Sequence, residues 1–315
     1  MSALHDALTE YLAMRRALGT QLGWPESSLR RFVDFVEAQG AQSVTTELAL
    51  RWAVQPQGVQ RATHRRRLEI VRGFAAWLQA TDPGTQVPPR GILPARQRRP
   101  VPHIYSDGEI ANLMAAAGRL RSASGLRPAT FRTLLGLLAA TGLRPGEAIA
   151  LDVGDVDIVS GVLMVRESKF GKSRFVPLDE SVRAALAAYA KFRDTVRPCR
   201  NTPAFLVTGR GSRLGPSTTR RTFARLCQAV GLRPRLHDRR IGRGPRLQDL
   251  RHTFATRRLT EWYRAGCDVD RLMPRLATYL GHVRVADTYW YIQAVPELLR
   301  LATERLEAAA SGEVR

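Results

Sequence analysis

The sequence has few cysteines and no long apolar run. Cys199, Cys227 and Cys267 lie far apart and form neither a CxxC pair nor a disulfide framework. No run approaches the 18 apolar residues of a membrane helix, and the first residues show no signal-peptide pattern. These absences argue against a secreted disulfide scaffold and against a membrane protein. They predict a cytoplasmic protein.

Acidic residues are also scarce. The 315 residues include 28 Asp and Glu against 49 Lys and Arg, so the formal net charge is +21. A compact chain with such an excess repels itself, and it is expected beside a polyanion. Most of the basic residues are Arg, which binds phosphate bidentately, and they are spread along the chain. This distribution favours nucleic acid over a membrane surface as the partner.

The proline distribution predicts two domains. Residues 1–82 show apolar residues three and four apart, as in a set of helices, and the helix at 61–78 has a strongly basic face. Residues 83–103 hold six prolines and four arginines, which is typical of an extended tether. We therefore predict a helical DNA-binding domain at 1–82, a linker at 83–103 and a larger domain at 104–315.

The larger domain is predicted to be mainly α with a small antiparallel β-sheet, an α+β fold. A buried helix at 130–140 is followed by Gly142, and Pro145 marks the next helix start, so Arg144 lies in a tight inter-helix corner. Residues 161–178 alternate as a β-hairpin with Lys169 near its tip. A short strand is expected at 204–207, a helix at 247–264 and a last amphipathic helix at 296–310.

The stretch from Tyr279 to Ile292 holds a Gly-His pair followed by Tyr289, Trp290 and Tyr291. Taken alone, such an aromatic run is most often core packing. It is, however, the last member of an ordered series of polar residues. The series runs Arg144 in a corner, Lys169 on a hairpin, Arg251 on a helix, His282 after a glycine, and Tyr291 nine residues beyond that histidine.

This series resembles the tyrosine recombinase (phage integrase) family. The matching segments are Ala-Thr-Gly-Leu-Arg-Pro-Gly-Glu at 140–147, Ser-Lys-Phe-Gly-Lys-Ser-Arg-Phe-Val-Pro-Leu at 168–178, Asp-Leu-Arg-His-Thr-Phe-Ala-Thr at 249–256, and Leu-Gly-His at 280–282 with Tyr291. The resemblance covers about residues 104–292. The N-terminal helices resemble the core-binding domain of that family more loosely.

The resemblance implies a site-specific DNA recombinase or integrase that cleaves and rejoins double-stranded DNA. Tyr291 would attack a phosphodiester and leave a 3′-phosphotyrosyl intermediate, with no metal or other cofactor. Arg144, Arg251 and His282 would contact the phosphate oxygens, and Lys169 would protonate the leaving 5′-oxygen. Four protomers would act on two DNA sites, with no membrane and no small-molecule substrate. The helix at 296–310 would either reach a neighbouring protomer or pack on its own domain.

One position departs from the family pattern. The family usually has His three residues before the second arginine, and this chain has Gln248, which cannot take up a proton near neutral pH. Either that role is dispensable, or His252 or His237 covers it. We favour the first, because His252 follows Arg251 on a helix and is expected to point about 100° away from it. Gln248 also leaves open a catalytically weakened, architectural DNA-binding relative.

Two further alternatives remain open from the sequence. A type IB-like topoisomerase would share the same Arg, Lys, His and Tyr chemistry. Glu147 or Asp249 would either orient the catalytic arginines or serve as helix caps.

Overall fold

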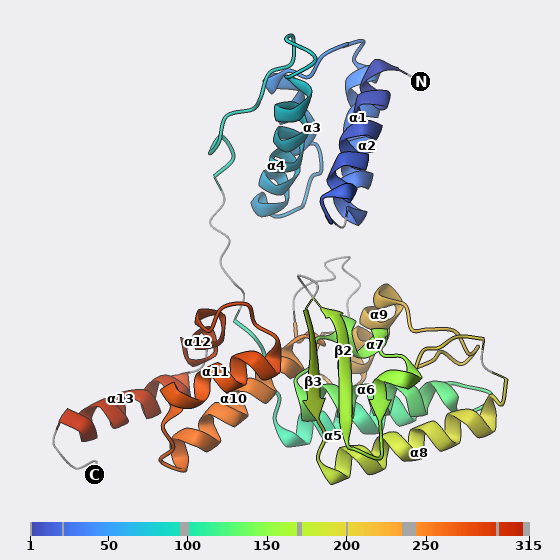
Figure 1. Cartoon of the computed structure of the whole chain (residues 1–315), viewed down its shortest axis with the longest axis vertical. Helices are drawn as coiled ribbons and strands as arrows, with labels where there is room; N and C mark the ends of the chain where they lie inside the picture. Colours follow the sequence, from blue (N-terminus) through green and yellow to red (C-terminus); the bar gives the residue numbers. More distant parts are fainter. Residues whose placement is uncertain are drawn as a thin grey trace. The chain divides into compact units, whose positions relative to one another are not determined.

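The computed structural model describes residues 2–20, 22–94, 101–168, 172–199, 201–234, 244–293 and 296–310. The chain divides into two compact units, Met1–Pro100 and Val101–Arg315, and each is described here by itself (Figure 1). Within the described ranges, no helix is both long and apolar enough to cross a membrane.

The first unit is a four-helix domain made of α1 (Ala3–Ala17), α2 (Gly23–Ala38), α3 (Thr46–Val54) and α4 (Arg61–Leu78). Apolar residues three and four apart put one face of each helix into a common core, because those positions share a face. Its largest fully buried side chains include Leu8, Leu12, Leu29, Phe32 and Phe74.

Part of the proline-rich stretch belongs to this first unit. Thr85 is 1% exposed, and the Gln86 N–H donates to the Val44 carbonyl at 2.7 Å. Val87 and Leu93 pack against the same helical core. The described residues up to 94 therefore continue the first unit, while residues 95–100 lie outside the described residues.

The second unit begins with α5 (Asp107–Gly118), α6 (Leu126–Thr141) and the short α7 (Pro145–Ala150). Ser106 and Glu109 form a capping box at the start of α5, which satisfies two of its free backbone N–H groups. Helix α6 is buried along most of its length and ends at Gly142, which has φ +62°. Pro145 then starts α7, so Arg144 occupies its N-cap position.

A three-stranded antiparallel sheet lies between α7 and the later helices in the chain. It consists of β1 (Val156–Asp157), β2 (Val162–Ser168) and β3 (Lys172–Pro177) in the order β1-β2-β3, preceded by a 3-10 turn at Val153–Asp155. Val165 pairs with Arg174, and the register is irregular between Val165 and Ser168. Lys169 lies outside the described residues. The fold is thus mainly α with a small antiparallel sheet, as predicted.

The strand predicted at 204–207 is wrong. Ala204 pairs only with Asp152 and Val207 only with Arg213, each through an isolated bridge. All four residues of the segment are buried, so the apolar run reflects burial and not membership of the sheet.

The remaining helices are α8 (Glu180–Val196), α9 (Pro216–Ala229), α10 (Asp249–Arg264), α11 (Val269–Leu280), α12 (Ala286–Gln293) and α13 (Pro296–Ala310). A second core cluster joins α10 to α13, and its members include Leu259, Met273, Leu280, Tyr291 and Leu298. Helix α13 packs on α10 and α12 of its own unit (Figure 1). Leu298 is fully buried there, whereas Leu299 and Leu306 are exposed.

Candidate active site

Four of the six site residues predicted from the sequence come together where α7, α10, α11 and α12 meet. They are Arg144, Arg251, His282 and Tyr291, which we call the cradle. Arg144 and Arg251 donate to backbone carbonyls at the end of α11, immediately before His282. His282 in turn stacks on the ring of Tyr291.

Arg251 is held rigidly in the first turn of α10. Its side chain is 2% exposed, and its two terminal nitrogens donate to the carbonyls of Gly142 at 2.9 Å and Leu280 at 2.6 Å. Burial lowers the pKa of this guanidinium, and the neighbouring Tyr291 hydroxyl opposes that shift. An arginine has five N–H donors, so three remain for an anion beside it.

Two glycine turns deliver the carbonyls that hold the arginines. Gly142 and Gly281 have φ +62° and +68°, a region that strongly favours glycine. A Cβ on Gly142 would meet a ring carbon of Phe254 at 2.5 Å. The Gly142 carbonyl accepts from Arg251, and the Gly281 carbonyl accepts from Arg144 at 3.2 Å. The geometry of both arginines therefore depends on close backbone turns.

Arg144 is fixed by Glu147, one turn along the chain. One terminal nitrogen of Arg144 donates to the Glu147 carboxylate at 2.6 Å, and the Arg144 backbone N–H donates to it at 2.9 Å. About a quarter of the Arg144 side chain is exposed, against 7% for Glu147. Asp249, the other candidate, instead pairs with Arg246 at 2.7 Å. Of the two carboxylates, Glu147 is the one that contacts a cradle arginine.

Arg174 on β3 was not among the predicted site residues, yet it also binds Glu147. Its two terminal nitrogens lie 3.1 and 2.9 Å from the two carboxylate oxygens. Burial alone would raise the pKa of Glu147, but the bonds from Arg174 and Arg144 outweigh it and hold that pKa below its usual value. Glu147 is therefore a buried, ionised carboxylate shared by two arginines.

His282 and Tyr291 stack face to face. Their ring centroids are 5.9 Å apart with an interplanar angle of 18°, and Tyr291 is 3% exposed. The Nδ1 atom of His282 lies 2.7 Å from the hydroxyl of Thr288, a fully buried residue of α12. Burial and the positive charges of Arg251 and Arg144 lower the pKa of His282 to about 4. His282 is therefore neutral at neutral pH.

His252 was expected to point away from Arg251, and it nevertheless lies beside Tyr291. Its ring lies edge-on to Trp290 and to Tyr291, with centroids 5.1 and 5.3 Å away. His252 therefore lies beside the ring of Tyr291, while Arg251 lies near its hydroxyl. Burial lowers the pKa of His252 to about 4, and its buried Nδ1 bonds to no group in the described part of the chain.

The other predicted residues have different surroundings. Gln248 immediately precedes α10 and is half-buried, and its amide makes no hydrogen bond to any described residue. Tyr289 is 38% exposed, and its hydroxyl donates to Asp270 at 2.9 Å. Lys169 and His237 lie outside the described residues.

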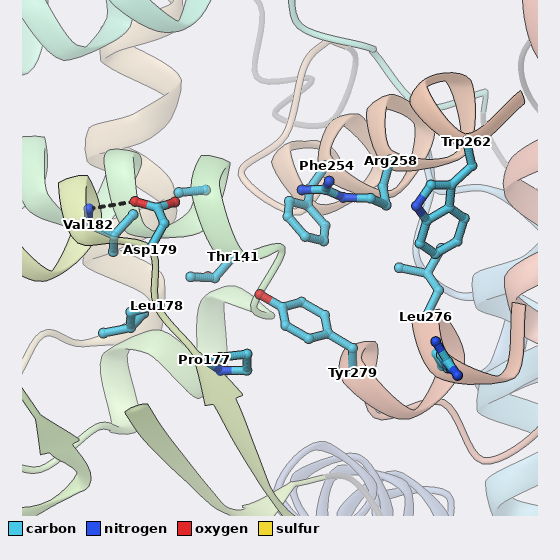
Figure 2. Close-up of a pocket in the computed structure, with 12 residues that line it drawn as sticks. Thr141, Pro177, Leu178, Asp179, Val182, Phe254, Arg258, Trp262, Leu276 and Tyr279 are labelled. Carbon is cyan, nitrogen blue, oxygen red and sulfur yellow. Dashed lines mark hydrogen bonds between the residues drawn. The ribbon is translucent and has the colours of Figure 1, made fainter. Parts of the chain in front are cut away.

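A cavity of about 500 Å³ is lined by α10, α11 and the segment from Pro177 to Val182. Figure 2 shows the side chains of Phe254, Arg258, Trp262 and Tyr279 around it, and the rings of Phe254 and Tyr279 stack at 5.6 Å. None of the four cradle residues lines this cavity. The cradle is therefore distinct from this apolar hollow.

Known proteins share both the sequence and the fold. Residues 106–297 match the phage integrase family. The chain is 44% identical to the integrase/recombinase y4rB of Sinorhizobium fredii, over 98% of each chain. It is 31% identical to the tyrosine recombinase XerD of Caulobacter vibrioides, over 93% of this chain and 92% of that one.

Two solved structures show the same fold at low sequence identity. The Tn1549 transposon integrase in complex with transposon right end DNA is 19% identical and superposes with a TM-score of 0.64, over 96% of this chain and 99% of that one. A lambda integrase dimer bound to a core site is 17% identical, with a TM-score of 0.60 over 91% and 94% of the two chains.

Proposed function

The chain belongs to the phage integrase family, and we propose that it is a recombinase that cuts and rejoins DNA at specific sites through Tyr291. One observation carries this proposal. Tyr291 is a buried tyrosine stacked on His282 and next to Arg251, and Arg144 is held against the same turn. Core packing alone would not gather two guanidinium groups and an imidazole at the turn beside a buried tyrosine, because buried charges are costly.

The two arginines supply the positive charge that phosphoryl transfer needs. When the Tyr291 oxygen attacks phosphorus, negative charge grows on the non-bridging oxygens as the bond to the 5′-oxygen breaks. Arg144 and Arg251 are permanently charged forked donors already fixed in place, so they stabilise that charge without reorganisation. Neutral His282 donates a further bond from Nε2 while Thr288 holds Nδ1. In this scheme the charge stabilisation comes from side chains and not from a metal.

Proton transfer completes the step. The products are a 3′-phosphotyrosyl enzyme and a 5′-hydroxyl, and Lys169 supplies the proton for the 5′-oxygen. Gln248 donates a hydrogen bond to the phosphate but accepts no proton, so the proton of Tyr291 passes to water. Attack by the 5′-hydroxyl of a partner strand reverses the chemistry and joins the new strands.

The first unit supplies a second DNA-binding surface in this proposal. On α4, Arg61 and Arg66 are exposed, whereas Arg65 pairs with Glu69 at 2.7 Å and Arg67 donates to the Trp52 carbonyl at 2.7 Å. Exposed arginines with few acidic neighbours bind phosphates and position the enzyme on the duplex. We propose that the two units grip one DNA site together, and that four protomers join two sites.

The test uses nicked suicide duplexes and the full-length chain. The duplex is first selected from a random pool by binding, and the nick is then moved one nucleotide at a time along it. At one nick position a short 5′-hydroxyl fragment should diffuse away and leave the protein on a 3′-end. Protein attached to a 5′-end, or no adduct at any nick position, would contradict the proposal.

A catalytically weakened relative is the second candidate, and Gln248 is the observation that favours it. It predicts tight binding of the selected duplex and no covalent adduct at any nick position. A type IB-like topoisomerase predicts instead that supercoiled DNA lacking the selected site is relaxed as fast as DNA that contains it. The recombinase proposal requires the adduct and a clear dependence on the site.

A further inference from the structure

Arg174 is a charged side chain that lies next to the cradle and binds Glu147, the carboxylate that also holds Arg144. It lies on β3, and its side chain is 10% exposed. All three of its guanidinium nitrogens are used, two on the Glu147 carboxylate at 3.1 and 2.9 Å and Nε on the Tyr279 carbonyl at 2.8 Å. Its guanidinium is therefore tied to α7 and to α11 at once.

Glu147 connects Arg174 to the cradle, because it also binds Arg144. Glu147 is 7% exposed and also accepts from the guanidinium of Arg144 at 2.6 Å. A buried ion pair adds little net stability, because desolvation offsets much of the attraction. A buried Arg-Glu-Arg series does, however, restrict each member to one geometry. Its clearest consequence here is a fixed direction for the exposed end of Arg144.

Arg174 also packs against the turn that precedes His282. A Cβ built on Gly281 would lie 2.7 Å from a terminal nitrogen of Arg174, closer than real Cβ contacts come. The Tyr279 carbonyl that accepts from Arg174 belongs to the last turn of α11, and in Figure 2 the Tyr279 side chain points into the neighbouring cavity. Arg174 thus fills the space behind the glycine turn that presents His282.

The strand that carries Arg174 leads to the hairpin turn. Val165 of β2 pairs with Arg174, and the register shift between Val165 and Ser168 lies on the turn side of that pair. Residues 169–171, including Lys169, connect the two strands. Of the described hairpin residues, Arg174 is the one that binds Glu147, so any change in the position of β3 acts on Glu147 through it.

We infer that Arg174 is a positioning residue that couples the β2–β3 hairpin to the cradle by orienting Arg144 through Glu147. The inference rests on the proposed function, because it assigns Arg144 a role in phosphate binding. Arg174 touches no reacting atom in this account. Through this coupling, the orientation of Arg144 depends on the position of the β2–β3 hairpin.

The coupling has a pH signature that a purely structural role lacks. The charged groups that face Glu147 are Arg144 at the start of α7, Arg174 on β3 and Arg251 on α10. With Arg174 replaced by Met, burial dominates and the pKa of Glu147 rises. Glu147 then takes up a proton as the solution is acidified and releases Arg144. The variant should therefore lose activity in a pH range where the unaltered chain is still active.

The experiment measures the single-turnover rate of covalent adduct formation on the nicked duplex from pH 5 to pH 9. Arg174→Met should lower the rate by about 10²-fold at neutral pH, because misplacing a catalytic group by about 1 Å costs that much. The ratio of its rate to that of the unaltered chain should fall further toward pH 5. Arg174→Lys keeps the charge and should restore the acid side of the profile but only part of the rate.

Arg166→Met is the matched control. Arg166 lies on β2 of the same hairpin and pairs with the buried carboxylate of Asp155, away from the cradle. Its variant should keep the pH profile of the unaltered chain. If Arg174→Met leaves the rate unchanged, or lowers it by one constant factor at every pH, the coupling is refuted.

A DNA-free readout separates this inference from the proposed function. The stability loss caused by Arg174→Met should be smaller at pH 5 than at pH 7.5, because the buried Glu147 of the variant takes up a proton on folding. If the unaltered chain forms no adduct, the proposed function fails. A pH-independent stability loss refutes the Arg174–Glu147 coupling whether or not an adduct forms.

Discussion

His252 and Tyr291 meet edge to face, with ring centroids 5.3 Å apart and an interplanar angle of 61°. The buried Nδ1 atom of the same histidine has no hydrogen-bond partner in the described part of the chain. The Tyr291 ring is thus held by His252, by the stacked His282 and by the nearby Arg251. These contacts hold the Tyr291 ring in place.

Gln248→His tests whether the departure from the family pattern limits the reaction. Because the cradle already holds Tyr291, we expect the substitution to change the rate of adduct formation by less than about ten-fold at pH 7.5. A general base typically contributes about 10²–10⁴-fold. A gain of that size would show that Gln248 is a handicap. Gln248→Leu, which removes the donor, should slow the reaction without abolishing it.

Arg251→Lys should reduce the rate by about 10²–10³-fold, the usual cost of losing a preorganised donor. Lysine keeps the charge, but its single ammonium cannot bridge the carbonyls of Gly142 and Leu280 as the fork does. Arg257→Lys is the control on the same helix, since Arg257 is partly exposed and donates to the Tyr105 carbonyl. The control should retain the rate within a few-fold. Equal losses in the two variants would contradict a special role for Arg251.

Gly142→Ala and Gly266→Ala form a matched pair for the glycine turn. Both glycines have positive φ, so both substitutions incur the same backbone strain of about 1–2 kcal/mol. A Cβ at Gly266 meets nothing within 4 Å, whereas one at Gly142 meets Phe254. Urea unfolding should show Gly142→Ala less stable than Gly266→Ala by about 1–3 kcal/mol, an overpacking cost. Equal stabilities would mean that the turn does not pack as described.

Acid should destabilise the second unit between pH 6.5 and 4. The pKa of both His252 and His282 is lowered to about 4 in the folded chain, so the unfolded chain binds protons first as pH falls below 6.5. Urea midpoints should therefore drop from pH 7 to pH 5. His252→Phe keeps an aromatic ring against Tyr291 and should show a smaller drop. An undiminished drop in that variant would contradict the burial of His252.

The effect of His5 has the opposite sign. Contacts with Glu37 raise the pKa of His5, so its contribution to stability is present in acid and is lost as pH rises. It lies in the first unit. Comparison of His252→Phe with the unaltered chain at each pH removes this contribution from the result.

The sequence was informative where local rules decide the structure. Gly142 and Pro145 mark the end of one helix and the start of the next, so the corner that holds Arg144 could be predicted from neighbouring residues alone. The helix bounds of α4 and α13 follow from periodicity in the same way. The family motifs then selected the four residues that the structure brings together.

Contacts between distant segments were not predictable in this way. In the sequence Arg174 is an ordinary strand residue, and its contact with Glu147 of α7 appears only in the structure. In the same way, Thr288 is an ordinary helix residue until the structure shows its contact with His282. The direction of His252 was predicted from helix geometry alone, which omits the aromatic side chains that approach from α12. Such contacts depend on tertiary packing, which spacing along the chain does not encode.

The most direct test of the central claim compares Tyr291→Phe with Tyr289→Phe on the nicked suicide duplex. Each substitution removes one hydroxyl and leaves the ring, so the fold should be preserved in both variants. We expect Tyr291→Phe to bind the duplex and form no covalent adduct, whereas Tyr289→Phe, whose hydroxyl lies on Asp270, forms it at nearly the unaltered rate. An adduct that persists in Tyr291→Phe and disappears in Tyr289→Phe would contradict the assignment of the nucleophile.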